Sequence, residues 1–263
     1  MTGEASPQTV QHEGSASLGQ CLIARPPGGR LGDDRGGALV AVLAASALIL
    51  ALGLSLATTT AVEVGIAANH RDAVQTVHAA DAALEFAIAE LGTVPLWDAV
   101  LDGAVTSWFR DGAGAVVLPD GSRLDVAAET GLLRCGAPGP CGEADMDEQT
   151  AERPWGRNNP RWTVYASGRL ARLLREAAPS SRAYVVVWVG DDPSENDAQP
   201  LRDGGPPALV NAANPANPGR GALWLQVRAY GPAGARRTLE AVVERDARLP
   251  PETLRIRAWR EIM

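Results

Sequence analysis

The sequence contains no lysine, because all 24 of its basic residues are arginine. A Schiff-base mechanism and a P-loop both require lysine, so neither fits this chain. Histidine is almost as scarce, with His12, His70 and His78 all in the first third. Residues 92–263 therefore cannot form a Ser-His-Asp or Cys-His site of their own. We expect a protein that is not an enzyme.

Positive charge is not concentrated in any part of the chain. The 31 acidic residues outnumber the 24 basic ones and give a formal net charge of -7. A nucleic-acid-binding surface normally requires a basic patch or stripe, and no stretch of this sequence is basic enough to form one. We therefore expect no nucleic-acid partner.

Aromatic residues make up only 5% of the chain and are unevenly distributed. All seven Trp and all three Tyr lie beyond residue 92, and only Phe86 precedes it with Phe109 after it. Because large rings usually mark a packed core, a folded head is expected to begin after Gly92. Residues 38–91 are rich in Ala, Leu, Val and Thr and contain no proline, which favours one long helix.

The longest apolar run is residues 38–57, ALVAVLAASALILALGLSLA, which carries no charge. At about 1.5 Å rise per residue this run spans about 30 Å, the thickness of a hydrocarbon core. A buried helix or a cleaved secretory signal could have a similar composition, although signal cores are usually shorter. Arg25, Arg30 and Arg35 precede the run, so the positive-inside rule places residues 1–35 in the cytoplasm.

Beyond the apolar run, polar residues enter without breaking the helical period. Spacings of three, seven, four and three place five apolar side chains on one face: Val74, Val77, Leu84, Ile88 and Leu91. Many alanines keep this amphipathic stem slim, which permits close approach of other helices. Gly92 and Pro95 then predict the end of the helix.

The head has the pattern of an antiparallel β-sheet. Strands are predicted over residues 162–169, 182–190, 222–230 and 236–245, where Val, Tyr and Trp are frequent or apolar and polar residues alternate. The segment Gly-Pro-Ala-Gly between the last two predicts a hairpin turn. A short helix over residues 170–177 and an edge strand near residues 254–259 are also expected. The fold class is therefore α+β, with a long helix packed on a meander of at least four strands.

A polar leader, an uncharged helical half, an amphipathic half and a globular head follow one another in the order found in type IV pilins. The stretch RGGALVAVLAASALILALGLSLATTTAVEVGIAANHRDAVQTVHAADAALE resembles the N-terminal region of PilX-like minor pilins and covers about a fifth of the chain. The resemblance depends on the Arg35-Gly36 junction, the Thr tract at residues 58–60, Asn69 with Arg71 and Asp72, and residues 79–84 with Glu85. Ala68 and Asp81 depart from the residues that the family often has there, Gly and Glu.

The resemblance implies a pilin-like division of the chain: a prepilin leader (1–36), a transmembrane half-helix (37–61), an amphipathic stem (62–92) and a β-rich head (93–263). A prepilin peptidase would recognise Arg35, Gly36 and Gly37, cut after Gly36 or after Gly37, and methylate the new N-terminus. The subunit would lie in the inner membrane with its head in the periplasm before it enters the fibre. Its partners would be other major and minor pilins, the prepilin peptidase, the inner-membrane assembly platform and membrane lipid. The residues expected to pack in the fibre are Leu39, Ala41, Val42, Val74, Val77 and Leu84.

One departure from the pilin pattern bears on position in the fibre. Major pilins resemble one another in carrying Glu at the fifth mature residue, which here is Ala41, or Val42 with the later cut. An unpaired charge inside an apolar bundle is costly, so that Glu is thought to pair with the N-terminal amine of a neighbour. A subunit without it is expected where no neighbour needs that partner. This favours a priming or tip position.

The head contains two candidate sites. Cys135 and Cys141 could form a small disulfide if the head lies outside the cytoplasm, because zinc would need two further ligands that the head lacks. Four acids at the start of a long loop (191–221) could supply oxygen ligands for Ca²⁺: Asp191, Asp192, Glu195 and Asp197. They lack the spacing of an EF-hand, so we expect a solvated turn and no cofactor, with Ca²⁺ as the alternative.

Two other functions remain open from the sequence. The chain could be a permanently membrane-anchored periplasmic binding protein, with an ordinary signal-anchor at residues 38–57 and a ligand held by loop 191–221. It could also be a secreted enzyme, released by cleavage near Ala57 or Ala61. Processing distinguishes these from a pilin, because a permanent anchor keeps its leader and a secreted enzyme loses its membrane helix.

Overall fold

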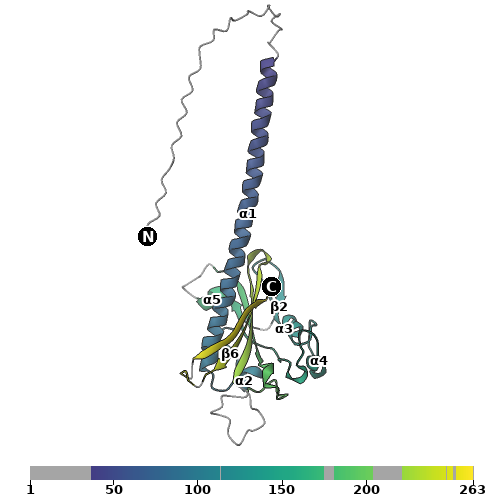
Figure 1. Cartoon of the computed structure of the whole chain (residues 1–263), viewed down its shortest axis with the longest axis vertical. Helices are drawn as coiled ribbons and strands as arrows, with labels where there is room; N and C mark the ends of the chain where they lie inside the picture. The colour runs from purple at the N-terminus through teal and green to yellow at the C-terminus, as the bar shows by residue number, and fades with distance from the viewer. Residues whose placement is uncertain are drawn as a thin grey trace, which may run out of the picture. The chain divides into compact units, whose positions relative to one another are not determined.

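The computed structural model describes residues 37–112, 114–174, 181–203, 221–246, 248–250 and 253–262. The predicted leader, 1–36, lies outside these residues. The chain divides into two units between Thr58 and Thr59. Helix α1 (Gly37–Thr93) is 57 residues long and confirms the single helix predicted over residues 38–91 (Figure 1).

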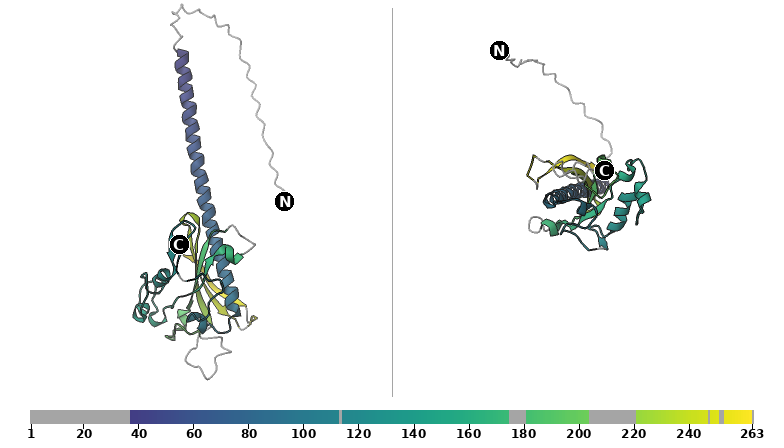
Figure 2. Two further views of the ribbon diagram at one scale, coloured as in Figure 1. Left: turned by 180° about the vertical axis from the view of Figure 1, so that it is seen from behind. Right: turned by 90° about the horizontal axis from the view of Figure 1, so that it is seen from below.

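The head is built on a five-stranded antiparallel sheet. Its strands are β3 (Thr163–Arg169), β4 (Tyr184–Asp191), β5 (Ala222–Tyr230), β6 (Arg236–Arg245) and β7 (Leu254–Ile262). Each strand pairs with the next in the chain, so the sheet is the predicted meander and β7 forms one edge (Figure 2). The turn η3 (Pro232–Gly234) joins β5 to β6, and the Gly231 amide donates to the Ala235 carbonyl at 2.7 Å.

One face of the sheet is covered by the C-terminal part of α1. Leu84, Ala87 and Leu91 recur at intervals of three and four and are fully buried. They share a core with apolar side chains of the central strands, among them Val187, Leu225 and Leu239. The buried part of α1 begins at Thr76, so the core includes residues well before the Gly92 boundary that the aromatic residues indicated.

Two side chains fix the end of α1. The Trp97 indole Nε1 donates to the Leu91 carbonyl at 3.1 Å, where the last turn of the helix has free acceptors. The Arg245 guanidinium lies 4.2 Å from the centre of the Trp97 ring and donates to the Val94 carbonyl. Trp97 is followed by the short helix α2 (Asp98–Leu101), whose Val100 and Leu101 belong to the same core.

The other face of the sheet is covered by elements that the sequence patterns did not predict. They are the hairpin of β1 (Ala115–Val117) with β2 (Arg123–Asp125), and helix α3 (Val126–Cys135). Asp125 caps α3, with its Oδ1 accepting from the amides of Ala127 at 2.9 Å and Ala128 at 3.1 Å. Because both faces are covered, every residue of β4 is buried.

The contact between α3 and the sheet combines a polar and an apolar part. Trp188 is fully buried, and its indole Nε1 donates to the Thr130 hydroxyl at 2.9 Å. Arg228 forms an ion pair with Glu129 and lies over the Trp188 ring, with its guanidinium carbon 5.3 Å from the ring centre. Buried Tyr184, Val186 and Tyr230 extend the same cluster along the sheet.

Short helices connect these elements. They are α4 (Glu143–Asp147), η1 (Gly156–Asn158), α5 (Leu170–Leu174) and η2 (Pro193–Glu195). Helix α5 begins where the helix over residues 170–177 was predicted, and residues 175–177 lie outside the described part of the chain. Of the predicted loop 191–221, the structure describes residues 191–203 and 221.

Candidate functional site

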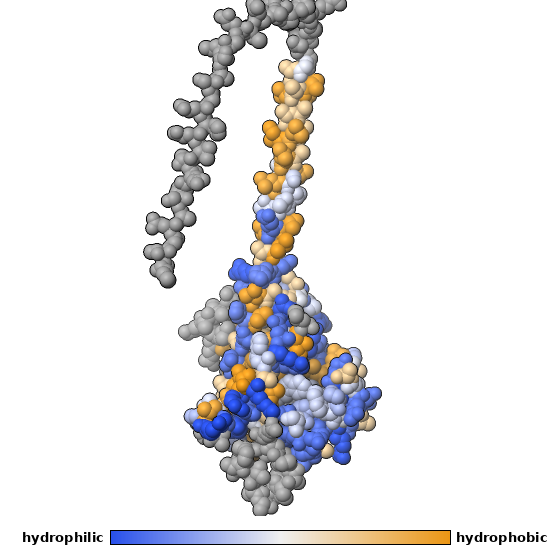
Figure 3. Space-filling view, viewed as in Figure 1, coloured by the Kyte–Doolittle hydropathy of each residue, from blue (hydrophilic) through white to orange (hydrophobic). Residues whose placement is uncertain are grey.

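The first part of α1 is an exposed apolar surface. Every side chain from residue 37 to 58 is exposed, including Leu39, Ala41 and Val42, and Leu50 reaches 73%. Figure 3 shows apolar residues along this part of the helix. By length and composition, α1 is able to cross a membrane, and the apolar window is not buried by any described part of the chain. The structure thus contains a helix suited to membrane anchoring.

The few hydroxyl groups in this surface are paired within the helix. The Ser46 hydroxyl donates to the Val42 carbonyl at 2.8 Å, and the Thr58 hydroxyl donates to the Ser55 carbonyl at 2.8 Å. An unpaired hydroxyl in hydrocarbon is costly, whereas a hydroxyl that bonds back to its own helix is tolerated. These polar residues are therefore compatible with an apolar environment.

One of the three predicted processing residues lies at the start of this helix. Gly37 is the first residue of α1, and Arg35 and Gly36 lie outside the described residues.

The six residues expected to pack in a fibre fall into different environments. Val74 is 39% exposed, and Val77 is half-buried. Leu84 is only 2% exposed because it packs into the core of its own head. Leu84 is therefore not accessible to a neighbouring subunit, which corrects that part of the prediction. The helical period identified a buried face correctly, but the sheet of the same chain covers it.

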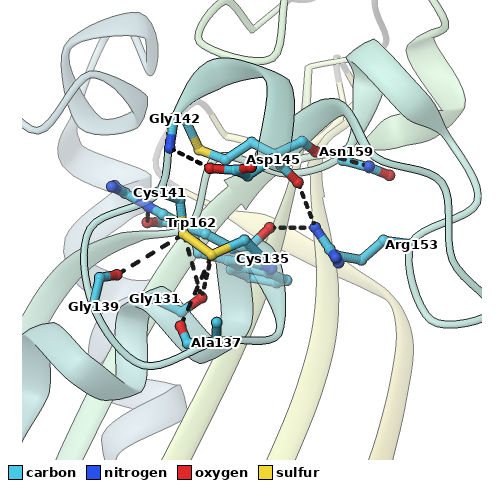
Figure 4. Close-up of a disulfide and its surroundings, with 12 residues drawn as sticks. Gly131, Cys135, Ala137, Gly139, Cys141, Gly142, Asp145, Arg153, Asn159 and Trp162 are labelled. Atoms are coloured by element: carbon cyan, nitrogen blue, oxygen red, sulfur yellow. Dashed lines mark hydrogen bonds between the residues drawn. A yellow bond between two sulfur atoms is a disulfide. The ribbon is translucent and has the colours of Figure 1, made fainter.

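A disulfide joins Cys135, the last residue of α3, to Cys141 (Figure 4). The Cα atoms of the two residues are 6.3 Å apart. Between them Gly136 ends the helix with a positive φ of 74°, and its amide donates to the Leu132 carbonyl at 2.9 Å. Gly131 allows the loop to cross the helix closely, because a Cβ at this position would collide with the backbone of Gly139.

Arginine side chains attach the disulfide segment to the rest of the head. Arg153 Nη1 donates to the Arg134 carbonyl at 2.7 Å. It also donates to the Asp145 carbonyl at 3.1 Å (Figure 4). Arg134 Nε in turn donates to the Trp162 carbonyl at 2.7 Å. These bonds connect α3 and α4 to the segment that leads into β3, so this disulfide segment has a structural role in holding the loops.

Three of the four acids at the start of loop 191–221 converge. Asp191 is the last residue of β4 and pairs with Leu223 of β5, so its position is set by the sheet. One carboxylate oxygen from each of Asp191, Glu195 and Asp197 lies within 4.8 Å of the others. Asp192 is not part of this group, because it accepts from the Ser194 amide at 3.0 Å and lies 3.5 Å from Arg257.

Burial distinguishes this group from a solvated turn. Asp191 is 3% exposed, and its Oδ1 has no hydrogen-bond partner among the residues that the structure describes. Burial, together with the charges of Glu195, Asp203 and Asp197, raises the pKa of Asp191 to about 10. The expected solvated turn is therefore wrong for Asp191. Asp203 was not identified from the sequence, because only folding brings it near residues twelve positions away.

The backbone around the acids is held by the neighbouring loop. Asn158, at the end of η1, donates from Nδ2 to the Asn196 side-chain oxygen at 3.1 Å. Its own Oδ1 accepts from the Ala198 amide at 2.6 Å. Asn196 has a left-handed conformation with a φ of 53°, which places Glu195 and Asp197 on either side of a tight bend.

Comparison with protein families, with curated proteins and with solved structures finds no match for this chain.

Proposed function

We propose that this chain is a minor pilin, a non-enzymatic structural subunit of a type IV pilus or a related pseudopilus. The observation that supports the proposal is the continuity of α1. The helix begins as an exposed apolar segment and continues without a break into residues buried on an antiparallel sheet. A simple membrane anchor needs only about 20 apolar residues and no helical connection to its folded domain.

The proposed position of the subunit is at the tip, where it would prime or cap the fibre. Residues 37–62 contain no acidic side chain, so this helix brings no carboxylate to pair with the N-terminal amine of a neighbour. Ala41 and Val42, at the fifth mature position for the two possible cuts, are both exposed and apolar. Such a subunit joins others by packing, with helices of major and minor pilins replacing lipid around residues 37–58.

The proposed cycle has three steps that involve different partners. The prepilin peptidase removes residues up to Gly36 or Gly37 while the helix lies in the inner membrane. The assembly platform then moves the subunit out of the membrane. In the fibre, the exposed apolar half of α1 contacts other pilins while the buried face of α1 stays on its own sheet.

The proposal is tested by the mass of the N-terminal peptide of the full chain. The protein is produced in membranes with an active type IV prepilin peptidase or with a catalytically inactive one. We expect a methylated N-terminus at Gly37 or Ala38 only with the active peptidase. Gly36→Val and Gly37→Val are tested alongside, because the variant at the residue before the cut should remain unprocessed.

The other results of this measurement reject the proposal. A retained Met1 in both strains would favour the permanently anchored periplasmic binding protein. A start near residue 60 would favour a secreted protein that has lost the apolar half of α1. Gly53→Val is a control, because it changes a glycine inside the apolar half and should leave the cut unaffected.

A further inference from the structure

The carboxylate of Asp191 lies in an environment that a carboxylate does not occupy without compensation. The side chain is 3% exposed, and no described residue forms a hydrogen bond with its Oδ1. Glu195 and Asp197 direct carboxylate oxygens toward the same point. Asp197 Oδ1 accepts from the Gln199 amide at 2.8 Å, but its Oδ2 is buried and has no hydrogen-bond partner in the described part of the chain. Buried polar atoms in folded proteins are normally satisfied, so the Asp191 and Asp197 oxygens call for a partner.

The separation of the three oxygens fits a single ion. Ca²⁺ binds oxygen at about 2.4 Å, so two of its ligands lie no more than about 4.8 Å apart. The three carboxylate oxygens meet that limit without any movement of the backbone. Mg²⁺ usually keeps several of its waters and is bound through only one or two carboxylates, so a group of three carboxylates suits it less well. Zn²⁺ and other softer metals prefer nitrogen or sulfur, and this group offers only oxygen.

We propose that Asp191, Glu195 and Asp197 form a Ca²⁺ site at the end of β4. The ion would complete the coordination of the buried Asp191 oxygen and offset two of the three negative charges that the carboxylates carry when ionised. The sheet fixes Asp191, and the Asn158 hydrogen bonds fix the bend at residues 196–198, so the ion would join two elements that are already positioned. The site does not depend on the proposed function, because it lies wholly within the head.

The site is tested on the full chain in detergent, after removal of divalent ions with a chelator. Melting is followed by tryptophan fluorescence while CaCl₂ is added, and binding is measured by titration calorimetry. We expect one Ca²⁺ per chain and a rise in the melting temperature of about 5 °C or more at 100 times the dissociation constant. MgCl₂ at the same concentration should give a much smaller shift.

Variants of neighbouring acids separate this site from general charge screening. Asp191→Asn and Asp197→Asn should each reduce Ca²⁺ affinity at least about tenfold. Asp192→Asn is the matched control, because Asp192 is adjacent in sequence but lies outside the group, and it should retain the calcium response. The fold of each variant is checked by circular dichroism, and calorimetry measures binding directly even where the melting temperature has changed.

Two results would overturn the proposal. One is the absence of both calorimetric binding and a calcium-dependent shift in the wild-type chain. The other is an equal response in Asp191→Asn, Asp192→Asn and the wild type, which would indicate non-specific screening of a net-negative protein. Neither result would bear on the N-terminal processing that tests the pilin proposal.

Discussion

Two parts of α1 are both rich in alanine but have opposite environments. Residues 37–58 are exposed at every position, whereas many of the residues from 76 to 92 are buried on the sheet. Helix propensity does not explain the difference, because both parts are rich in alanine and belong to the same helix. The difference comes from residues far away in the sequence. Strands β4, β5 and β6 provide an apolar partner for one part, and no described part of the chain buries the apolar window of the other.

The largest expected effect comes from removing the exposed part. A chain that begins at Thr59 should stay in the aqueous phase, and a chain that begins at Gly37 should stay with membranes after carbonate washing. The reason is that the apolar window of α1 is long enough to span a bilayer and has no cover within the described residues. Fractionation of cell membranes followed by immunoblotting measures this. Membrane association of the shorter chain would show that the head has its own membrane contact.

The second prediction compares one leucine from each part. Leu84→Ala should lower the free energy of unfolding by about 2–5 kcal/mol, because it leaves a cavity in the core between α1 and the sheet. Leu50→Ala should change it by less than about 0.5 kcal/mol, since the Leu50 side chain is exposed. Urea unfolding of the detergent-solubilised chain, followed by tryptophan fluorescence, gives both values. If the two substitutions lowered the free energy of unfolding equally, the two parts of α1 would not differ in their contribution to the stability of the head.

The third prediction concerns the opposite face of the sheet. Replacing Cys135 and Cys141 together by Ser should destabilise the head by about 2 kcal/mol, because the bond closes a short loop and limits the unfolded chain. Membrane association should be unchanged, since the exposed part of α1 is far from these residues in the sequence. Thermal melting with and without a reducing agent measures the first effect. A reductant that shifts the double variant as much as the wild type would contradict the assignment.

The smallest effects are expected from two glycines. Gly231→Ala should cost about 1–2 kcal/mol, because its Cβ would collide with the Thr76 hydroxyl where α1 meets the β5–β6 turn. Gly53→Ala should be neutral or stabilising by less than about 1 kcal/mol, because nothing lies within 4 Å and alanine is the better helix former. Differential scanning calorimetry can resolve the opposite signs. A Thr76→Ala background should relieve the cost at Gly231.

The strands were predicted well because their boundaries are encoded locally. The predicted strands over residues 222–230 and 236–245 coincide with β5 and β6. Gly221 and the Gly231–Gly234 turn interrupt the strand pattern at the two ends of β5, and this is why the predicted ends of these two strands are correct. The edge strand near residues 254–259 is also present as β7. Alternation along β5 indicated two faces, but it did not reveal that α3 covers the second one.

The elements that were missed are short or depend on distant partners. Strands β1 and β2 have three residues each, too few for a periodic pattern. Helix α3 had usable signals, namely Asp125 before it and Gly136 after it, which cap its two ends. Tryptophan was only a partial guide to the core, because Trp97 and Trp188 are buried whereas Trp108 and Trp259 are half exposed.

The acidic candidate site was predicted in part. The local sequence brought the four acids together, but it could not distinguish Asp192, which turns away to cap η2, from Asp191, which points into the group. That distinction arises from the alternation of side chains at the end of β4. The contribution of Asp203 depends on the course of the chain after η2, for which no local rule exists.

The hydrogen bonds of Trp97 and Arg245 at the end of α1 have a mechanical consequence. A pull on the N-terminal end of the helix reaches the head first at Thr76 and last at Leu91, where Trp97 and Arg245 hold the final turn. The force is therefore distributed over about four helical turns of buried contact before it reaches the bonds of Trp97 and Arg245. A helix attached only at its last turn would transmit the same force through a few bonds. The packing of α1 on the sheet therefore resists displacement of the helix from the head when force is applied along it.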